Sequence, residues 1–425
     1  MKKIIVFLSL LLFFLGEVVL LTTSSYGQTY QTFVSEIKNI NETAKLKFGP
    51  FRIFPAFQIS NIGYDNNVYY RPASLEPIAD YTATFGFRAD IHFIFQNWLL
   101  FTFTENPAYL YFAEQKDQRY LNNNYAFNLR LLAFSRIVLS GTHRFGNERT
   151  LLSSEVTARV IHKTNENYGS IFYETPRNTS MGFTGGIREF KYEDTTVPGA
   201  ETPVSISLNR EERSAIGEFY YRVFSDSNFF ANFGYFENTF DYPQSKFRDS
   251  YAYQLYSGIR FPVLGRARGL LSLGYKKLVP RKKGLQGFSG IVGDTSFEIR
   301  IRRFNYRLEY SRDTPFSIFG NNIYFNQNRY GAGISFYLNQ FIRLDYNFSR
   351  GENMYPELQL IVLPDGTNEE IKRKDIYDVH SGAIVIRIVK NTGIGLRADY
   401  WERKSNYPGA NVHRFFAGGF LTYEF

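Results

Sequence analysis

The feature that most constrains this chain is an alternation of apolar and polar residues that runs much longer than an ordinary strand. From Tyr81 to Phe95 every second residue is apolar, and the residues between them are polar or small except for Ile94. Successive side chains of a strand point to opposite faces, so one face here meets an apolar environment and the other a polar one. About 15 residues are involved, whereas half-buried strands of soluble sandwiches usually show this pattern over about four to eight.

The alternation recurs up to the end of the chain, and short and long connections alternate between its segments. The same pattern occurs in 250–261, 304–310, 342–348, 394–400 and 414–425. Short connections are predicted near residues 96–97, 134–135, 176–177, 226–227, 264–265, 302–303, 339–340 and 390–391. Long ones are predicted at 63–79, 113–121, 147–164, 193–211, 242–248, 280–289, 313–321, 351–373 and 404–411. Eight tight turns join sixteen strands, and an unpaired strand at each end brings the total to about 18, with 16 or 20 if one hairpin is miscounted.

This plan predicts an all-β protein, a transmembrane antiparallel up-and-down β-barrel over residues 47–425 with short periplasmic turns and long extracellular loops. In lipid every backbone N–H and C=O must be paired within the protein, so a sheet crosses a membrane only when it closes on itself. The 43 Phe and 32 Tyr residues suit strands and argue against a helical or a disordered chain. The alternative is a soluble all-β protein, which leaves the length of the pattern unexplained.

The N-terminus has the layout of a secretory signal peptide. Lys2 and Lys3 precede an apolar stretch from Ile4 to Leu15, and the small residues Ser25 and Gly27 stand before Gln28. We predict a signal peptide over 1–27, cleaved at Gly27/Gln28, and the bacterial outer membrane as destination. An uncleaved N-terminal anchor is the alternative. Residues 28–46 follow as a short periplasmic or plug segment, with Val34, Ile37 and Ile40 at helical spacing.

The C-terminus resembles the terminal strand of Gram-negative outer-membrane barrels, which commonly ends on Phe and is recognised by the barrel-assembly machinery. The residues that carry this resemblance are Phe415, Leu421, Tyr423 and Phe425. The resemblance implies outer-membrane lipids and that machinery as partners.

The polar positions of the strands are rich in arginine. Counting by alternation gives about 15 inward arginines against about 8 inward acids, in a chain of net charge +9. Nine of these arginines lie within about six residues of a tight turn and are predicted to form a basic collar: Arg130, Arg222, Arg260, Arg268, Arg300, Arg302, Arg343, Arg387 and Arg397. A lining of one sign favours counter-ions, so the collar predicts anion selectivity. The alternative is that acids on neighbouring positions neutralise these arginines.

Two segments could narrow the lumen. The predicted loop 147–164 is long enough to fold inward, and residues 28–46 could form a short amphipathic plug. An ordinary surface loop and a periplasmic tail are the respective alternatives.

Two short stretches carry a family resemblance. Residues 62–69 (IGYDNNVY) follow the first strand, and residues 173–179 (YETPRNT) stand at a central turn. With them the chain resembles a family of outer-membrane β-barrel porins whose genes often sit near exopolysaccharide export systems. It is also similar in plan to alginate export barrels. The resemblance implies export of an anionic polysaccharide, with periplasmic export components as further partners.

The sequence therefore predicts a passive outer-membrane pore for anionic solutes or for export of an anionic exopolysaccharide. The alternative is a surface-binding barrel whose long loops, such as 193–211 and 351–373, contact polymer or host. We expect no enzyme: cysteine is absent, and the five His residues show no metal or triad spacing. No cofactor, metal or nucleic acid is expected.

Overall fold

The computed structural model describes residues 32–152, 155, 158–175, 179–195, 202–224, 227–263, 267–319, 322–362, 367–389 and 391–424. The predicted signal peptide (1–27), the beginning of the segment 28–46, and Phe425 of the predicted assembly signal lie outside the described residues. So does the whole predicted turn at 176–177 within the family-like stretch 173–179.

Two helices and twenty strands make up the described chain. The helices are α2 (Phe33–Thr43) and α3 (Val204–Leu208), with short 3₁₀ turns at Lys116–Gln118 and Pro243–Arg248. The first strands are β1 (Leu46–Phe48), β2 (Phe51–Asp65), β3 (Asp80–Phe95), β4 (Leu99–Glu105), β5 (Ala108–Phe112), β6 (Tyr120–Ala133), β7 (Ile137–Leu151), β8 (Arg159–Glu174), β9 (Thr179–Tyr192) and β10 (Arg210–Phe224). The others are β11 (Ser227–Phe240), β12 (Ser250–Val263), β13 (Ala267–Pro280), β14 (Phe288–Ile301), β15 (Phe304–Asp313), β16 (Asn326–Tyr337), β17 (Ile342–Val362), β18 (Asn368–Val389), β19 (Thr392–Ser405) and β20 (Val412–Glu424).

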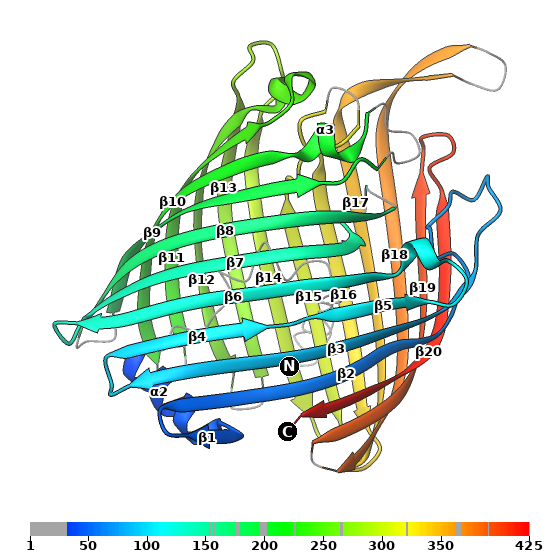
Figure 1. Ribbon diagram of the computed structural model, residues 1–425. Coiled ribbons are helices and arrows are strands. Elements are labelled where there is room, and N and C mark those ends of the chain that lie inside the picture. Colours follow the sequence, from blue (N-terminus) through cyan, green and yellow to red (C-terminus); the bar gives the residue numbers. More distant parts are fainter. Residues whose placement is uncertain are drawn as a thin grey trace, which may run out of the picture.

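These strands form one closed antiparallel barrel with 18 wall strands (Figure 1). β1 only adds a short hairpin to the start of β2, and β4 and β5 are two halves of one wall strand, because both pair with β3 and with β6. Every other strand pairs with its neighbours in the chain, as in an up-and-down meander. The last strand closes the barrel on the first: β20 pairs with β2 from Ala56↔Glu424 to Asp65↔Phe416. The predicted fold class and strand number are confirmed.

The connections separate the barrel into two ends, as predicted. The turn end carries the eight short connections, together with α2 and β1, and the loop end carries the long ones and α3 (Figure 1). Two predicted loops are wrong in extent. β7 and β8 continue to Leu151 and from Arg159, so the connection in 147–164 is only 152–158. Likewise most of 351–373 is strand.

The second correction gives the barrel its most prominent feature. β17 and β18 are 21 and 22 residues long, and together they form a hairpin that projects past the rim at the loop end (Figure 1). Pairing runs from Ile342↔Ile386 to Val362↔Asn368, with a shift between Met354 and Leu358. Strict alternation is interrupted here: 358–363 (LQLIVL) is nearly all apolar, and 364–375 is mostly polar. Alternation of apolar and polar residues therefore fails to identify it, although backbone pairing continues.

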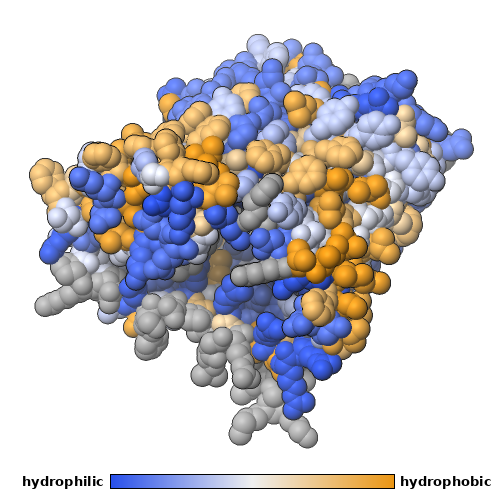
Figure 2. Space-filling model, turned by 60° about the horizontal axis from the view of Figure 1, so that its bottom comes forward, coloured by the Kyte–Doolittle hydropathy of each residue, from blue (hydrophilic) through white to orange (hydrophobic). Residues whose placement is uncertain are grey.

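The outer wall is apolar and exposed. Large side chains at outward positions are highly accessible, among them Leu255 at 55%, Leu273 at 61% and Leu396 at 67%. No described helix is long and apolar enough to cross a membrane. Figure 2 views the turn end, where hydrophilic side chains gather toward the middle and hydrophobic ones on the flanks. An apolar band of this size is stable only against hydrocarbon, with the polar lining facing water.

Candidate functional site in the barrel lumen

The inner wall carries a repeated arrangement of arginine and aspartate two residues apart. Side chains at i and i+2 share one face of a strand, so the two charged groups meet directly. The distances between guanidinium nitrogen and carboxylate oxygen are 2.7–2.9 Å. The pairs are Arg88–Asp90 on β3, Arg343–Asp345 on β17, Arg373–Asp375 on β18 and Arg397–Asp399 on β19. The arginine of each pair is therefore neutralised locally.

Further inward arginines pair with acids elsewhere on the wall. Arg188 Nε lies 2.7 Å from Glu166 Oε1 on the neighbouring strand, and Arg414 Nη2 lies 2.6 Å from Asp65 Oδ2 across the closing seam. Arg268 reaches Glu298 at 3.8 Å. Much of the positive charge counted from sequence is thus compensated, as the alternative interpretation expected.

One sector of the turn end differs. The ends of β14, β16, β17 and β18, with the turns that join β14 to β15 and β16 to β17, enclose a cavity of about 530 Å³, which we call the arginine cavity. Five arginines line it, and none of its lining residues is acidic: Arg300, Arg302, Arg303, Arg343 and Arg387. It is the densest cluster of predicted collar residues in the described part of the chain.

The local structure explains how these side chains are held. Arg300 lies over the ring of Tyr337, 4.7 Å from guanidinium carbon to ring centroid, and Arg303 Nη1 donates to the carbonyl of Leu338 at 3.2 Å. Arg302 occupies the tight turn itself, with φ 53°. Within the described residues, neither Arg302 nor Arg387 forms an ion pair with a carboxylate. These two charges, unlike those of the Arg-x-Asp pairs, remain available to a ligand.

The structure brings four of the nine predicted collar residues into this cavity and places the other five elsewhere: Arg130, Arg222, Arg260, Arg268 and Arg397. Arg130 forms an ion pair with Glu36 of α2, and Arg397 pairs with Asp399. Arg303 belongs to the cavity but is absent from the predicted set, because alternation assigns neighbouring residues to opposite faces. The doublet Arg302–Arg303 was the available sequence signal for this residue. Both arginines stand at a tight turn, where neighbouring side chains need not point to opposite faces as they do in a strand.

The opposite side of the turn end is covered by α2. Phe33, Ile37 and Ile40 recur at i, i+4 and i+7 on one helix face and are buried, whereas Val34, grouped with them in the sequence pattern, is 51% exposed. They pack on apolar side chains of inward positions from β2 to β8: Phe54, Ile94, Leu100, Leu132, Val138 and Phe172. Part of the predicted segment 28–46 therefore lies against the lumen wall.

A buried apolar cluster lies at the loop end. Apolar residues from several connections and strand ends pack together: Val160, Val204, Leu208, Ile318, Phe319, Phe325 and Tyr355. Within the cluster Arg373 lies 3.9 Å above the centroid of the Phe319 ring, so its charge is covered by aromatic surface. Connections far apart in sequence thus meet across the mouth.

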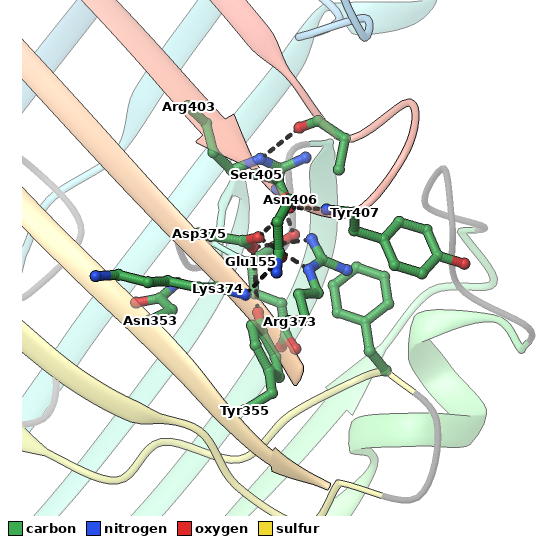
Figure 3. Close-up of polar contacts among 12 residues, drawn as sticks. Glu155, Asn353, Tyr355, Arg373, Lys374, Asp375, Arg403, Ser405, Asn406 and Tyr407 are labelled. Atoms are coloured by element: carbon green, nitrogen blue, oxygen red, sulfur yellow. Dashed lines mark hydrogen bonds and ion pairs between the residues drawn. The ribbon is translucent and has the colours of Figure 1, made fainter. Parts of the chain in front are cut away.

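A polar network crosses this cluster (Figure 3). Arg373 Nη2 donates to Asp375 Oδ2 at 2.8 Å, Ser405 Oγ donates to Asp375 Oδ1 at 2.5 Å, and Arg403 Nη1 donates to the carbonyl of Glu155 at 3.1 Å. Glu155 accepts from Ser317 Oγ at 2.5 Å and from the Ile318 N–H at 3.0 Å. The part of 147–164 that holds Glu155 therefore reaches the connection between β15 and β16.

Burial dominates the chemistry of Glu155, which is only 1% exposed. Loss of solvation raises the pKa of its carboxyl from 4.5 to about 7, although the bonds from Ser317 and Ile318 and the charge of Arg373 oppose the shift. None of these residues was predicted as functional, since the alternation ends before the loops. The one signal was the Arg-x-Asp spacing of 373–375, which repeats that of the wall pairs.

Among the residues that the structure describes, no group of three or more His, Asp or Glu side chains is placed to hold a metal ion. His92 contacts Thr102 and His143 contacts Asn167, each as a neighbour across two strands.

No protein-family model matches the chain, and no curated protein sequence matches it. Solved structures match by fold. Acinetobacter baumannii OccAB3 aligns with a TM-score of 0.51 and 10% identity, over 88% of this chain and 99% of that one. Pseudomonas aeruginosa OccK3 (OpdO) aligns with a TM-score of 0.48 and 10% identity over 93% and 99% of the two chains. P. aeruginosa OpdQ gives 0.49 and 10%, over 88% and 97%. At this identity the likeness to OccAB3 establishes the fold alone, a barrel of the outer-membrane porin type.

Proposed function

We propose that this protein is an outer-membrane pore that passes anionic solutes or exports an anionic polysaccharide. The observation that carries the proposal is the arginine cavity, which has no acid among its lining residues and five guanidinium groups, of which only that of Arg343 belongs to an Arg-x-Asp pair. Guanidinium groups make forked hydrogen bonds to carboxylate, sulfate and phosphate, so an anion passing this rim exchanges water for matched donors.

The distribution of charge supports a role for this rim rather than for the whole wall. The Arg-x-Asp pairs and the cross-strand pairs are neutral as units, so their fields fall off quickly. Arg302 and Arg387 have no such partner among the described residues, and their field extends into the water at the mouth. Low-dielectric walls concentrate that field, which raises the local concentration of anions.

The test is the reversal potential of the purified barrel in a planar bilayer under a salt gradient. Replacing Arg302 and Arg387 by Ser is expected to lower the anion-to-cation permeability ratio by about two- to fivefold, because each exposed charge contributes about 1 kcal/mol or less in water. The matched control is Lys282→Ser with Lys283→Ser, which removes two exposed positive charges from the loop between β13 and β14. A cation-selective wild-type barrel, or equal shifts in both variants, would contradict the proposal.

The assembly and partner predictions belong to the same proposal. Phe415 and Tyr423 are outward on β20 and are 41% and 36% exposed, so they are accessible to lipid and to assembly machinery. Periplasmic export components are the partners expected if the cargo is a polymer. The neighbouring genes would separate export from uptake.

A surface-binding barrel is the second candidate, and one observation favours it. The β17–β18 hairpin projects past the rim and exposes Leu358 and Leu360, at 53% and 62%. The bilayer measurement separates the two candidates, because a binding barrel with a filled mouth gives no stepwise conductance.

A further inference from the structure

We propose that α2 is an N-terminal plug, which occupies one side of the turn-end mouth and limits passage through the barrel. The inference rests on the proposed pore function. Its basis is that an amphipathic helix lies against an apolar patch on the inner wall. In a water-filled lumen, polar groups would be expected at these inward positions.

The patch is built by register across six strands. Ile94 on β3 faces Leu100 on β4, and Leu100 faces Arg130 on β6. Leu132 on β6 faces Val138 on β7, which in turn faces Phe172 on β8. Phe54 on β2 completes it. Side chains alternate between the two faces of a strand, and these residues alternate with the exposed Phe95 and Leu129 of the outer wall. The patch therefore lies on the inner wall.

The helix matches this patch in both shape and polarity. Where they pack on the patch, Phe33, Ile37 and Ile40 are only 0%, 2% and 8% exposed, so the apolar groups of helix and wall cover each other. Without α2 the six apolar side chains of the patch would face water inside the lumen, which is unfavourable. The patch therefore has a specific occupant, and that occupant is a segment of this chain.

Polar ties hold the helix at both ends. The Phe33 N–H donates to Glu174 Oε1 at 3.1 Å, and Arg52 Nε donates to Asn41 Oδ1 at 2.8 Å. Between them Glu36 forms its ion pair with Arg130, whose guanidinium carbon also lies 5.5 Å from the centroid of the Phe33 ring. These polar contacts add to the apolar packing and orient the helix over the patch.

The length of α2 decides what happens on release. It has 11 residues, with Thr32 as its N-cap, and is followed directly by Ala44 and the β1–β2 hairpin. Isolated helices shorter than about 12–15 residues are marginal in water. Away from the patch the segment loses its helical structure and becomes a flexible, unfolded chain. Such a chain obstructs the mouth much less than a helix about 10 Å in diameter.

Two readouts test the plug. The variant Phe33→Ser/Ile37→Ser/Ile40→Ser removes the apolar face but keeps chain length and charge, and Val34→Ser is the control on the exposed face of the same helix. In a planar bilayer we expect the triple variant to show roughly twofold larger single-channel conductance, because the helix no longer fills part of the mouth. The control is expected to match the wild type.

The second readout does not need conduction. The chain contains no cysteine, so Val138→Cys introduces a single thiol at the floor of the patch, where Val138 is 2% exposed. A water-soluble maleimide is expected to label it about tenfold faster in the triple variant than with α2 intact or with Val34→Ser. If the triple variant does not fold, Glu36→Arg is the substitute, with Glu36→Arg/Arg130→Glu as the swap that restores protection.

The outcomes separate the two proposals. Conductance that is anion-selective and unchanged by the triple variant, or equal labelling in all variants, overturns the plug and leaves the pore standing. Conductance that grows but is cation-selective supports the plug and overturns the anion pathway. A barrel that stays closed in both forms overturns both.

Discussion

At the scale of single residues, the environment of each arginine decides whether its charge is available. Arg397 and Arg387 are both inward on adjacent strands near the turn end, yet Arg397 has Asp399 two positions away and Arg387 lines a cavity without acids. Spacing in the sequence identifies the first case, since i and i+2 share a face. The second depends on which other strands meet at that rim, and alternation within one strand does not contain this information.

Glu155 gives a prediction at this scale. Burial raises its pKa to about 7. Between pH 4.5 and 7 the carboxyl of Glu155 therefore keeps its proton while the loop-end cluster is packed (closed), and loses it when the cluster opens and exposes the group to water. The closed packing is thus most stable at low pH and loses about 3 kcal/mol as pH rises through this window. In a Trp98→Phe background Trp401, which packs on Tyr70 at 5.6 Å, is the single tryptophan. Its emission should change with a midpoint near pH 7.

Glu155→Gln is the control for this measurement. The variant retains an acceptor for Ser317 but cannot ionise, so Trp401 emission should stay constant between pH 5 and 8. A transition that survives in the variant would assign it to another group.

At the scale of elements, the closing seam between β2 and β20 rests on a buried charge pair. Asp65 is 0% exposed, and Arg414 donates to it through Nε and Nη2. The seam joins residues about 350 positions apart in sequence, so it forms only after the whole wall is in place. The last strand was predicted from alternation and the first from the count of connections, but their pairing follows from closure and not from either segment alone.

Asp65→Asn is therefore expected to destabilise the barrel by about 3 kcal/mol, because it leaves the Arg414 charge buried without its partner. The midpoint of urea unfolding, followed by the gel mobility of unheated samples, measures this. The double variant Asp65→Asn/Arg414→Gln should recover part of the loss, since no unpaired charge remains. Equal stability of the single variant and the wild type would show that water reaches Arg414.

At the scale of the whole molecule, the barrel wall separates hydrocarbon outside from water in the lumen. Neighbouring residues on one strand face these two environments in turn. Phe183 on β9 points outward and is 51% exposed, while Thr184 points inward and donates to Glu218 Oε1 at 2.7 Å. The same substitution at these two positions therefore tests the assignment of faces with the backbone held constant.

Phe183→Arg is expected to cost about 2–4 kcal/mol if this position lies near the bilayer midplane, whereas Thr184→Arg places the guanidinium beside Glu218 and should cost much less. Refolding into lipid vesicles with a urea titration measures both. The reverse order of stability would invert the assignment of inner and outer faces along β9.

Much of this architecture was contained in the chain itself. The alternation from Tyr81 to Phe95 and its repeats specified long strands with unlike faces, and the spacing of turns specified about 18 of them. Both signals are local, because a period of two and a tight turn depend on adjacent residues only. The helical spacing of Ile37 and Ile40 marked α2 in the same way.

What only the tertiary structure decided is which side chains meet across the lumen. The arginine cavity collects residues from four strands, α2 finds its patch on the opposite wall, and Glu155 reaches Ser317 from a connection 162 positions away. The physical reason is closure. Bending the sheet into a cylinder brings inward side chains of distant strands together at each rim, and the distances between them depend on the curvature and register of the whole wall rather than on any one segment.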